Sequence, residues 1–127
     1  PQSAEEAAAN REAQAVARRA AQIDLLMGKG QALLDLGRAE EALSCFDETL
    51  RLDPRHTEAL VKKGEALEQA RKPDEAIACY DRAIAADRSL TVAYLHKGGL
   101  FNRLERHEEA LQCYEAALKT QETAGGG

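Results

Sequence analysis

The cysteines of this chain recur at a fixed interval of 34 residues, at Cys45, Cys79 and Cys113. The same interval separates three Lys-Gly pairs, Lys29-Gly30, Lys63-Gly64 and Lys97-Gly98, and three Glu-Ala pairs, Glu41-Ala42, Glu75-Ala76 and Glu109-Ala110. Such a period is typical of proteins that stack copies of one supersecondary unit, so it constrains the fold more than any single motif does. It divides the chain without gaps into three units, residues 23–56, 57–90 and 91–124.

Each unit has the pattern of a helical hairpin. In the first unit Leu26, Leu33 and Leu34 recur at helical spacing, and Gly37 can end that helix in a left-handed conformation. A second helix follows and stops before Pro54, because the residue ahead of a proline avoids helical geometry. Ala, Leu, Glu, Arg and Lys dominate the composition, and β-branched residues are scarce. The sequence therefore predicts an all-α fold.

The three units resemble tetratricopeptide repeats (TPRs). The family pattern sets apolar, small and aromatic residues at fixed offsets, where the first unit holds Leu26, Lys29-Gly30, Leu33, Ala42, Phe46, Thr49 and Pro54. The second unit holds Leu60, Lys63-Gly64, Leu67, Ala76, Tyr80, Ala83 and Arg88, and the third holds Tyr94, Lys97-Gly98, Phe101, Ala110, Tyr114 and Ala117. The departures are Lys for Leu before each Gly, Thr49 for Ala and Arg88 for Pro. The resemblance implies a right-handed solenoid of three helical hairpins.

Residues 1–22 precede the repeats and are predicted to form an additional, Ala-rich N-terminal helix, since residues 3–22 contain no Gly or Pro. Ala9, Ala13, Val16 and Ala20 form a narrow apolar stripe that runs into the first unit. This helix is either continuous with the first repeat helix or meets it near Gln22. The stripe either caps the first repeat within the chain or packs on a second copy, which would give a homodimer.

The C-terminal end is polar and Gly-rich after Leu118, so it cannot supply the apolar helix that usually covers the last hairpin of a TPR array. Leu111 and Leu118 are therefore expected to be exposed, and with the N-terminal stripe they are the candidates for self-association. Because the chain also begins without Met, we expect a fragment in which further repeats or another chain cover this end. Residues 125–127 are expected to form a disordered tail.

The sequence contains no catalytic motif or cofactor-binding loop, which predicts a protein that is not an enzyme and needs no cofactor. Stacked repeats hold equivalent cysteines about 10 Å apart, too far for a disulfide or a shared metal ion. The three histidines also lack metal-ligand spacing. The net charge of -5 disfavours nucleic acid, and no apolar run is long enough for membrane insertion. Unpaired cysteines and the lack of a visible signal favour the cytoplasm.

The resemblance also implies a binding surface, because in TPR proteins the first helix of each hairpin lines a concave groove. Carried onto this sequence, the lining residues are Asp24, Met27, Gln31, Leu34, Asp35, Glu58, Val61, Lys62, Glu65, Glu68, Gln69, Val92, Leu95, His96, Gly99, Asn102 and Arg103. Acidic side chains dominate the first two units, with apolar residues between them. The groove is therefore expected to bind a basic and apolar peptide or helix of another protein.

One type of TPR ligand is disfavoured. Family members that hold the carboxylates of a chaperone's C-terminal peptide use a clamp of Lys, Asn, Asn, Lys and Arg. The corresponding positions here are Met27, Gln31, Lys62, Val92 and His96. The sequence therefore predicts a protein-interaction scaffold without this clamp. A self-assembly module and the regulatory arm of a larger protein stay open as alternatives.

Overall fold

The computed structural model describes residues 3–125 and holds six helices and no strand within that range. The helices pair in chain order into three hairpins. Their bounds are α1 Ala4–Asp35, α2 Ala39–Leu52, α3 Thr57–Gln69, α4 Pro73–Ala86, α5 Thr91–Arg103 and α6 His107–Gly125. The predicted all-α solenoid of helical hairpins is confirmed.

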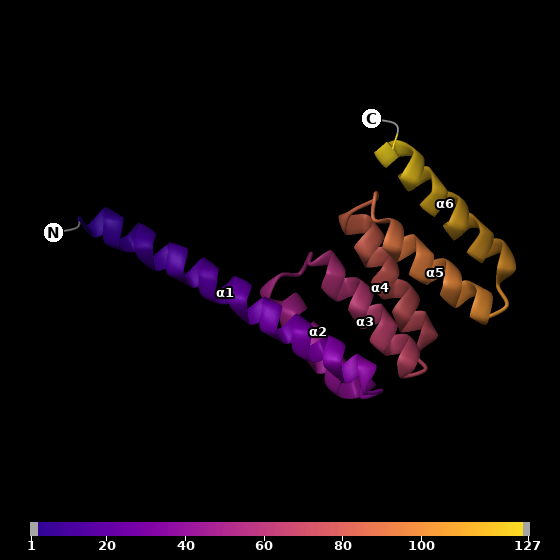
Figure 1. Ribbon diagram of the computed structural model, residues 1–127, viewed down its shortest axis with the longest axis horizontal. Coiled ribbons are helices and arrows are strands. Elements are labelled where there is room, and N and C mark those ends of the chain that lie inside the picture. The colour runs from indigo at the N-terminus through magenta and orange to yellow at the C-terminus, as the bar shows by residue number, and fades with distance from the viewer. Residues whose placement is uncertain (1–2, 126–127) are drawn as a thin grey trace.

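The three hairpins stack side by side, as Figure 1 shows. The second helix of each hairpin packs against the first helix of the next, so α2 contacts α3 and α4 contacts α5. The first helices are also neighbours, because α3 contacts both α1 and α5. A ligand on this side of the array can therefore touch three repeats at once.

Within each hairpin an aromatic ring of the second helix lies against a glycine of the first. A Cβ built on Gly30 would come within 2.5 Å of the Phe46 ring, and one built on Gly64 would overlap Tyr80 in the same way. Phe46 and Tyr80 are fully buried, so neither ring has room to move away. At Gly98 the nearest ring atom is 3.1 Å from the built Cβ. The repeated glycine thus permits the close approach of the two helices.

The turn inside each hairpin repeats one left-handed residue. Its φ angle is 76° at Gly37, 62° at Arg71 and 61° at Glu105. The following N–H closes the helix end, as where Arg38 donates to the carbonyl of Leu33 at 2.8 Å. The left-handed conformation predicted for Gly37 is confirmed, and the other two repeats adopt it with residues for which it is less favourable.

The lysine before each repeated glycine connects neighbouring hairpins. Lys63 Nζ lies 2.8 Å from Asp47 Oδ1, and Lys97 Nζ lies 2.6 Å from Asp81 Oδ1. In both pairs the lysine is on the first helix of a hairpin and the aspartate is on the second helix of the preceding one. Each lysine stem is mostly buried while its charge meets a half-exposed carboxylate. The departure from the family's leucine therefore supplies an ion pair between repeats.

The N-terminal segment and the first repeat helix form one continuous helix, α1, which projects away from the hairpins (Figure 1). Ala9, Ala13, Val16 and Ala20 are all exposed on this projection. Of the two arrangements considered for the stripe, capping of the first repeat within the chain is not what the structure shows. The physical reason is that an unbroken helix cannot turn back onto its own hairpin.

At the other end, α6 has 19 residues whereas α2 and α4 have 14 each. The tail expected from residue 125 onward has its first residue, Gly125, within this helix, and Gly126 and Gly127 lie outside the described residues. Leu111 and Leu118 are exposed on α6, as expected.

Gly64→Ala is expected to lower the free energy of unfolding by about 1–3 kcal/mol, because the new methyl group would overlap the buried Tyr80 ring. Gly28→Ala is the matched control, since no atom lies within 4 Å of its built Cβ. That change should raise the free energy of unfolding by about 0.5–1 kcal/mol, because Ala is the better helix former. Urea denaturation followed by circular dichroism measures both variants. A Gly64→Ala protein as stable as the wild type would show that the Tyr80 ring can shift to make room for the methyl group.

Candidate functional site

A hollow of about 320 Å³ lies where α1, α3 and α5 face the same side. Its walls come from all three repeats, and every lining residue belongs to the groove set expected from the sequence. The lining residues are Gln31, Leu34, Asp35, Glu65, Glu68, Gln69, His96 and Arg103. The fold therefore gathers about half of that set into one cavity.

Glu68 connects three helices inside the hollow. The hydroxyl of Tyr80, from α4, donates to Glu68 Oε2, and the guanidinium of Arg103, from α5, pairs with Glu68 Oε1. The Glu68 side chain is only 14% exposed, so these bonds replace water that it has lost. Burial, reinforced by the bond to Glu68, holds the pKa of Tyr80 well above its ordinary value. The phenol therefore stays protonated and serves as a donor.

Glu65 and His96 face each other across the hollow. The His96 ring stacks on Tyr80 with ring centroids 5.7 Å apart, and its Nε2 lies 4.0 Å from Glu65 Oε1. Lys62 Nζ is 3.4 Å from Glu65 Oε2, an ion-pair distance without hydrogen-bond geometry. Glu65 Oε2 is buried and accepts no hydrogen bond from the residues that the structure describes. Since the Glu65 side chain as a whole is 28% exposed, the hollow presents a carboxylate that is only partly neutralised by Lys62.

The α1 side of the hollow is held by two amide side chains. Gln31 donates to Asp35 Oδ1 at 2.9 Å, and Gln69 donates to the carbonyl of Leu34 at 3.0 Å, which ties α3 to α1.

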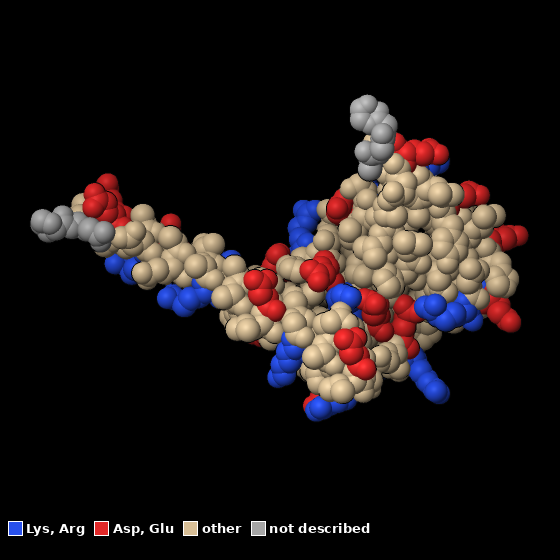
Figure 2. Space-filling view, viewed as in Figure 1, with Lys and Arg blue, Asp and Glu red and all other residues tan. Residues whose placement is uncertain are grey.

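In all, three carboxylates and one guanidinium line the hollow, so its charge is negative. On the face in Figure 2, acidic side chains gather over the middle of the repeat array with basic side chains beside them.

The other residues expected in the groove do not line this hollow. Val61 is buried in the core and Met27 packs against that core, since both lie where hairpins meet. Lys62 is half-buried beside Glu65. The exposed or half-exposed remainder is spread along the first helices: Asp24, Glu58, Val92, Leu95, Gly99 and Asn102.

Tyr80 was not among the residues expected at the site, because it belongs to the second helix of its hairpin. The equivalent residue of the first repeat is Phe46, which is fully buried without a polar atom. A tyrosine at a buried aromatic position signals a polar partner, because a buried phenol needs a hydrogen bond. The sequence does not identify that partner. The packing of α4 against α3 places Glu68 within hydrogen-bond distance of the Tyr80 hydroxyl.

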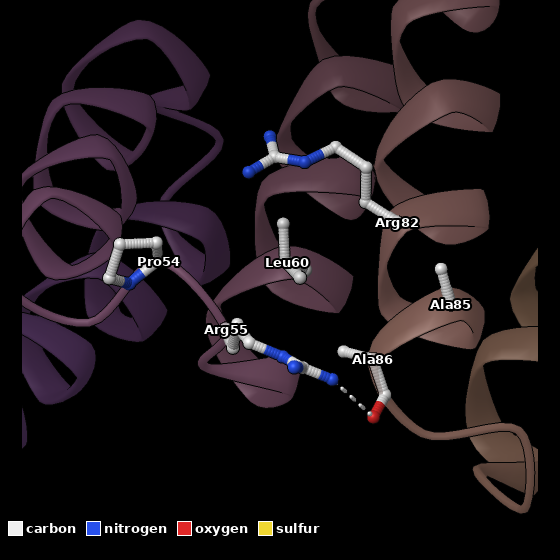
Figure 3. Close-up of a pocket in the computed structure, with 6 residues that line it drawn as sticks. All are labelled: Pro54, Arg55, Leu60, Arg82, Ala85 and Ala86. Atoms are coloured by element: carbon white, nitrogen blue, oxygen red, sulfur yellow. Dashed lines mark hydrogen bonds between the residues drawn. The ribbon is translucent and has the colours of Figure 1, made fainter.

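A second hollow, of about 360 Å³, lies beside the turn after α2 and the end of α4 (Figure 3). It is lined by Pro54, Arg55, Leu60, Arg82, Ala85 and Ala86. The Arg55 guanidinium donates to the carbonyl of Ala86 at 3.4 Å and so satisfies a carbonyl at the end of α4. This explains Arg55 as a structural contact, and the hollow between α1, α3 and α5 is the stronger candidate site.

In the described part of the chain, no cluster of His, Cys, Asp and Glu is placed to hold a metal ion. None of the described helices is both long and apolar enough to cross a membrane. The three cysteines are free and buried, and burial raises the pKa of the Cys79 and Cys113 thiols.

The tetratricopeptide repeat model matches the chain at residues 27–91 and again at 70–126. None of the curated proteins matches the chain in sequence. Together the two matched ranges span most of the chain.

Solved structures show the same fold. A crystal structure of MamA superimposes with a TM-score of 0.76 at 19% identity, over 83% of this chain and 61% of MamA. The first TPR of Spaghetti (RPAP3), bound to the HSP90 peptide SRMEEVD, gives a TM-score of 0.72 at 27% identity, over 78% of this chain and 79% of that one. The first TPR domain of human RPAP3 gives 0.73, also at 27% identity, over 78% of each chain.

Tyr80→Phe is expected to lower the free energy of unfolding by about 1 kcal/mol, because Glu68 loses one hydrogen-bond donor while the ring still packs on Gly64. Tyr114→Phe is the matched control from the third repeat, since its hydroxyl has no hydrogen-bond partner among the described residues. Urea denaturation of the two variants measures the difference. Equal losses would mean that the bond to Glu68 adds nothing measurable.

Proposed function

The chain belongs to the tetratricopeptide repeat family, and on that premise we propose that it binds a basic and apolar peptide or helix of another protein in the hollow between α1, α3 and α5. The role of protein-interaction scaffold follows from the family and the fold. The chemistry of the ligand follows from the side chains that line the hollow.

The carboxylates supply the basic preference, and Glu65 carries the argument. Its Oε2 atom is buried and accepts no hydrogen bond from the described residues. The nearest charge to this atom is Lys62 Nζ, at 3.4 Å. An arginine or lysine of a ligand can pair with the Glu65 carboxylate, whose side chain is 28% exposed, and with the exposed carboxylate of Asp35. The only guanidinium in the hollow, from Arg103, is already paired with Glu68.

The apolar preference rests on carbon surface beside the carboxylates. Leu34 lines the hollow itself, and Val92 and Leu95 are exposed on α5. An extended peptide or a helix could place a basic side chain against Glu65 and an apolar one against α5. Charge fixes the register and apolar contact adds affinity in this mode of recognition.

The RPAP3 repeat offers a useful contrast, because the peptide bound to it, SRMEEVD, carries three acidic residues. In the present chain such a peptide would bring its carboxylates toward Asp35 and Glu65. Like charges at that distance are unfavourable. We therefore propose that this chain shares the scaffold of that repeat and prefers a ligand of opposite charge.

The test is a fluorescence anisotropy titration with three peptides: one with Arg and Leu residues, the same peptide with Glu in place of Arg, and SRMEEVD. Only the first is expected to bind. Asp35→Asn with Glu65→Gln should weaken it by about tenfold or more, because both carboxylates lose their charge. Added salt should also weaken it.

Glu58→Gln is the matched control, because Glu58 is an exposed carboxylate on α3 outside the hollow. It should leave the dissociation constant unchanged. If Glu58→Gln weakened peptide binding as much as the double variant does, the effect would be general charge attraction and not binding in the hollow. Tighter binding of SRMEEVD than of the basic peptide would overturn the proposed ligand chemistry.

A further inference from the structure

The second helices of the three hairpins carry the same apolar positions in different surroundings. Leu43 and Leu50 on α2 are each 8% exposed. Their equivalents 34 residues later, Ile77 and Ile84 on α4, are half-buried against the core. The equivalents on α6 are Leu111, 59% exposed, and Leu118, 64% exposed. What covers the first two pairs is the first helix of the following hairpin, since α2 packs on α3 and α4 on α5.

The covering helices use a constant set of positions. On α3 these include Ala59 and Ala66, which are both 0% exposed and lie one helical turn on either side of Lys63, the residue paired with Asp47 of α2. On α5 the equivalents are Ala93 and Leu100, which are also buried. The surface that packs on a second helix is therefore an alanine-leucine face.

The α1 helix presents this covering face with nothing packed on it. Leu25, the equivalent of Ala59 and Ala93, is 74% exposed. Ala32, the equivalent of Ala66 and Leu100, is exposed as well. Together Leu25 and Ala32 offer one large and one small side chain, as Ala93 and Leu100 do, with the two sizes exchanged. Volume-conserving exchanges of this kind are well tolerated in packed interfaces.

Charge follows the same pattern. Inside the array Lys63 pairs with Asp47 and Lys97 pairs with Asp81. Extending the interval of 34 residues in both directions gives Lys29 on the uncovered face of α1 and Glu115 on the uncovered face of α6. Each end of the array thus carries one half of an ion pair that the repeats already use twice.

We propose that copies of this chain associate head to tail, with the Leu25, Lys29 and Ala32 face of α1 in one copy packed on the Leu111, Glu115 and Leu118 face of α6 in the next. The contact continues the packing of α2 on α3 and of α4 on α5. The paired helices of the array are antiparallel, so with Leu25 opposite Leu118 the residues of α1 before Arg18 run past the C-terminal end of α6, which lies at Gly125. None of the six residues of these two faces lines the hollow between α1, α3 and α5, so the inference does not rest on the proposed function.

Contacts between two different faces form either closed rings or open chains. Because this contact continues the stacking of the hairpins, we expect open chains that lengthen as the protein concentration rises. Sedimentation velocity at increasing concentration measures this. Leu118→Asp should weaken the association by about tenfold or more, because it places a charge in an apolar contact. Lys29→Glu and Glu115→Lys should each weaken it too, because each sets like charges opposite one another.

The decisive sample is an equimolar mixture of the Lys29→Glu and Glu115→Lys proteins. In the mixture, each copy meets an opposite charge on its neighbour at both ends, so association should return although neither variant associates well alone. Glu108→Lys is the control, since its equivalents Glu40 and Asp74 are exposed inside the array. It should associate like the wild type.

Three results would overturn the proposal: a monomer at every concentration, association that survives both charge variants, or a mixture no better than its components. A mixture that fails while Leu118→Asp still disrupts association would place the contact on α6 but against another surface. Because none of the residues substituted in this test lines the hollow, failure of the peptide titration would leave these outcomes unchanged.

Discussion

The close contact between a glycine of one helix and an aromatic ring of the next is the interaction on which the rest of this structure depends. Phe46 on Gly30 and Tyr80 on Gly64 leave no room for a Cβ between the helices, so the two helices of these hairpins lie close together. Interiors packed at this density transmit such a constraint rather than absorb it. The repeat of one contact along the chain is what makes the stack regular.

The regular stacking also determines where polar side chains of different repeats come together. Because the hairpins repeat, α1, α3 and α5 are neighbours on one side, and polar residues from three repeats meet there. The constraint and the site share a residue: the ring of Tyr80 packs on Gly64, while its hydroxyl donates to Glu68 and its face stacks on His96. A side chain buried in the core thus contacts two of the residues that line the hollow.

The two end helices, α1 and α6, expose the faces that join repeats inside the array. Within the stack, the faces that join repeats are buried and their Lys–Asp pairs satisfied, whereas α1 and α6 present the same faces to solvent. Each repeat contacts only its neighbours, so an end repeat is an interior repeat with one contact missing. Exposure of Leu25, Leu111 and Leu118 is the direct consequence, and it is the basis of the proposed head-to-tail contact.

The sequence by itself determined the repeat, the hairpins, the turn at Gly37 and the exposure of Leu111 and Leu118, because period and helical spacing report which face of a helix is apolar. Only the tertiary structure decided that α1 is continuous, that Val61 is buried in the core, and that Glu68 is engaged by Tyr80 and by an arginine from the next repeat. The reason is physical: a pattern assigns a residue to a helix face, but burial and pairing depend on which neighbour packs there and how far its side chain reaches.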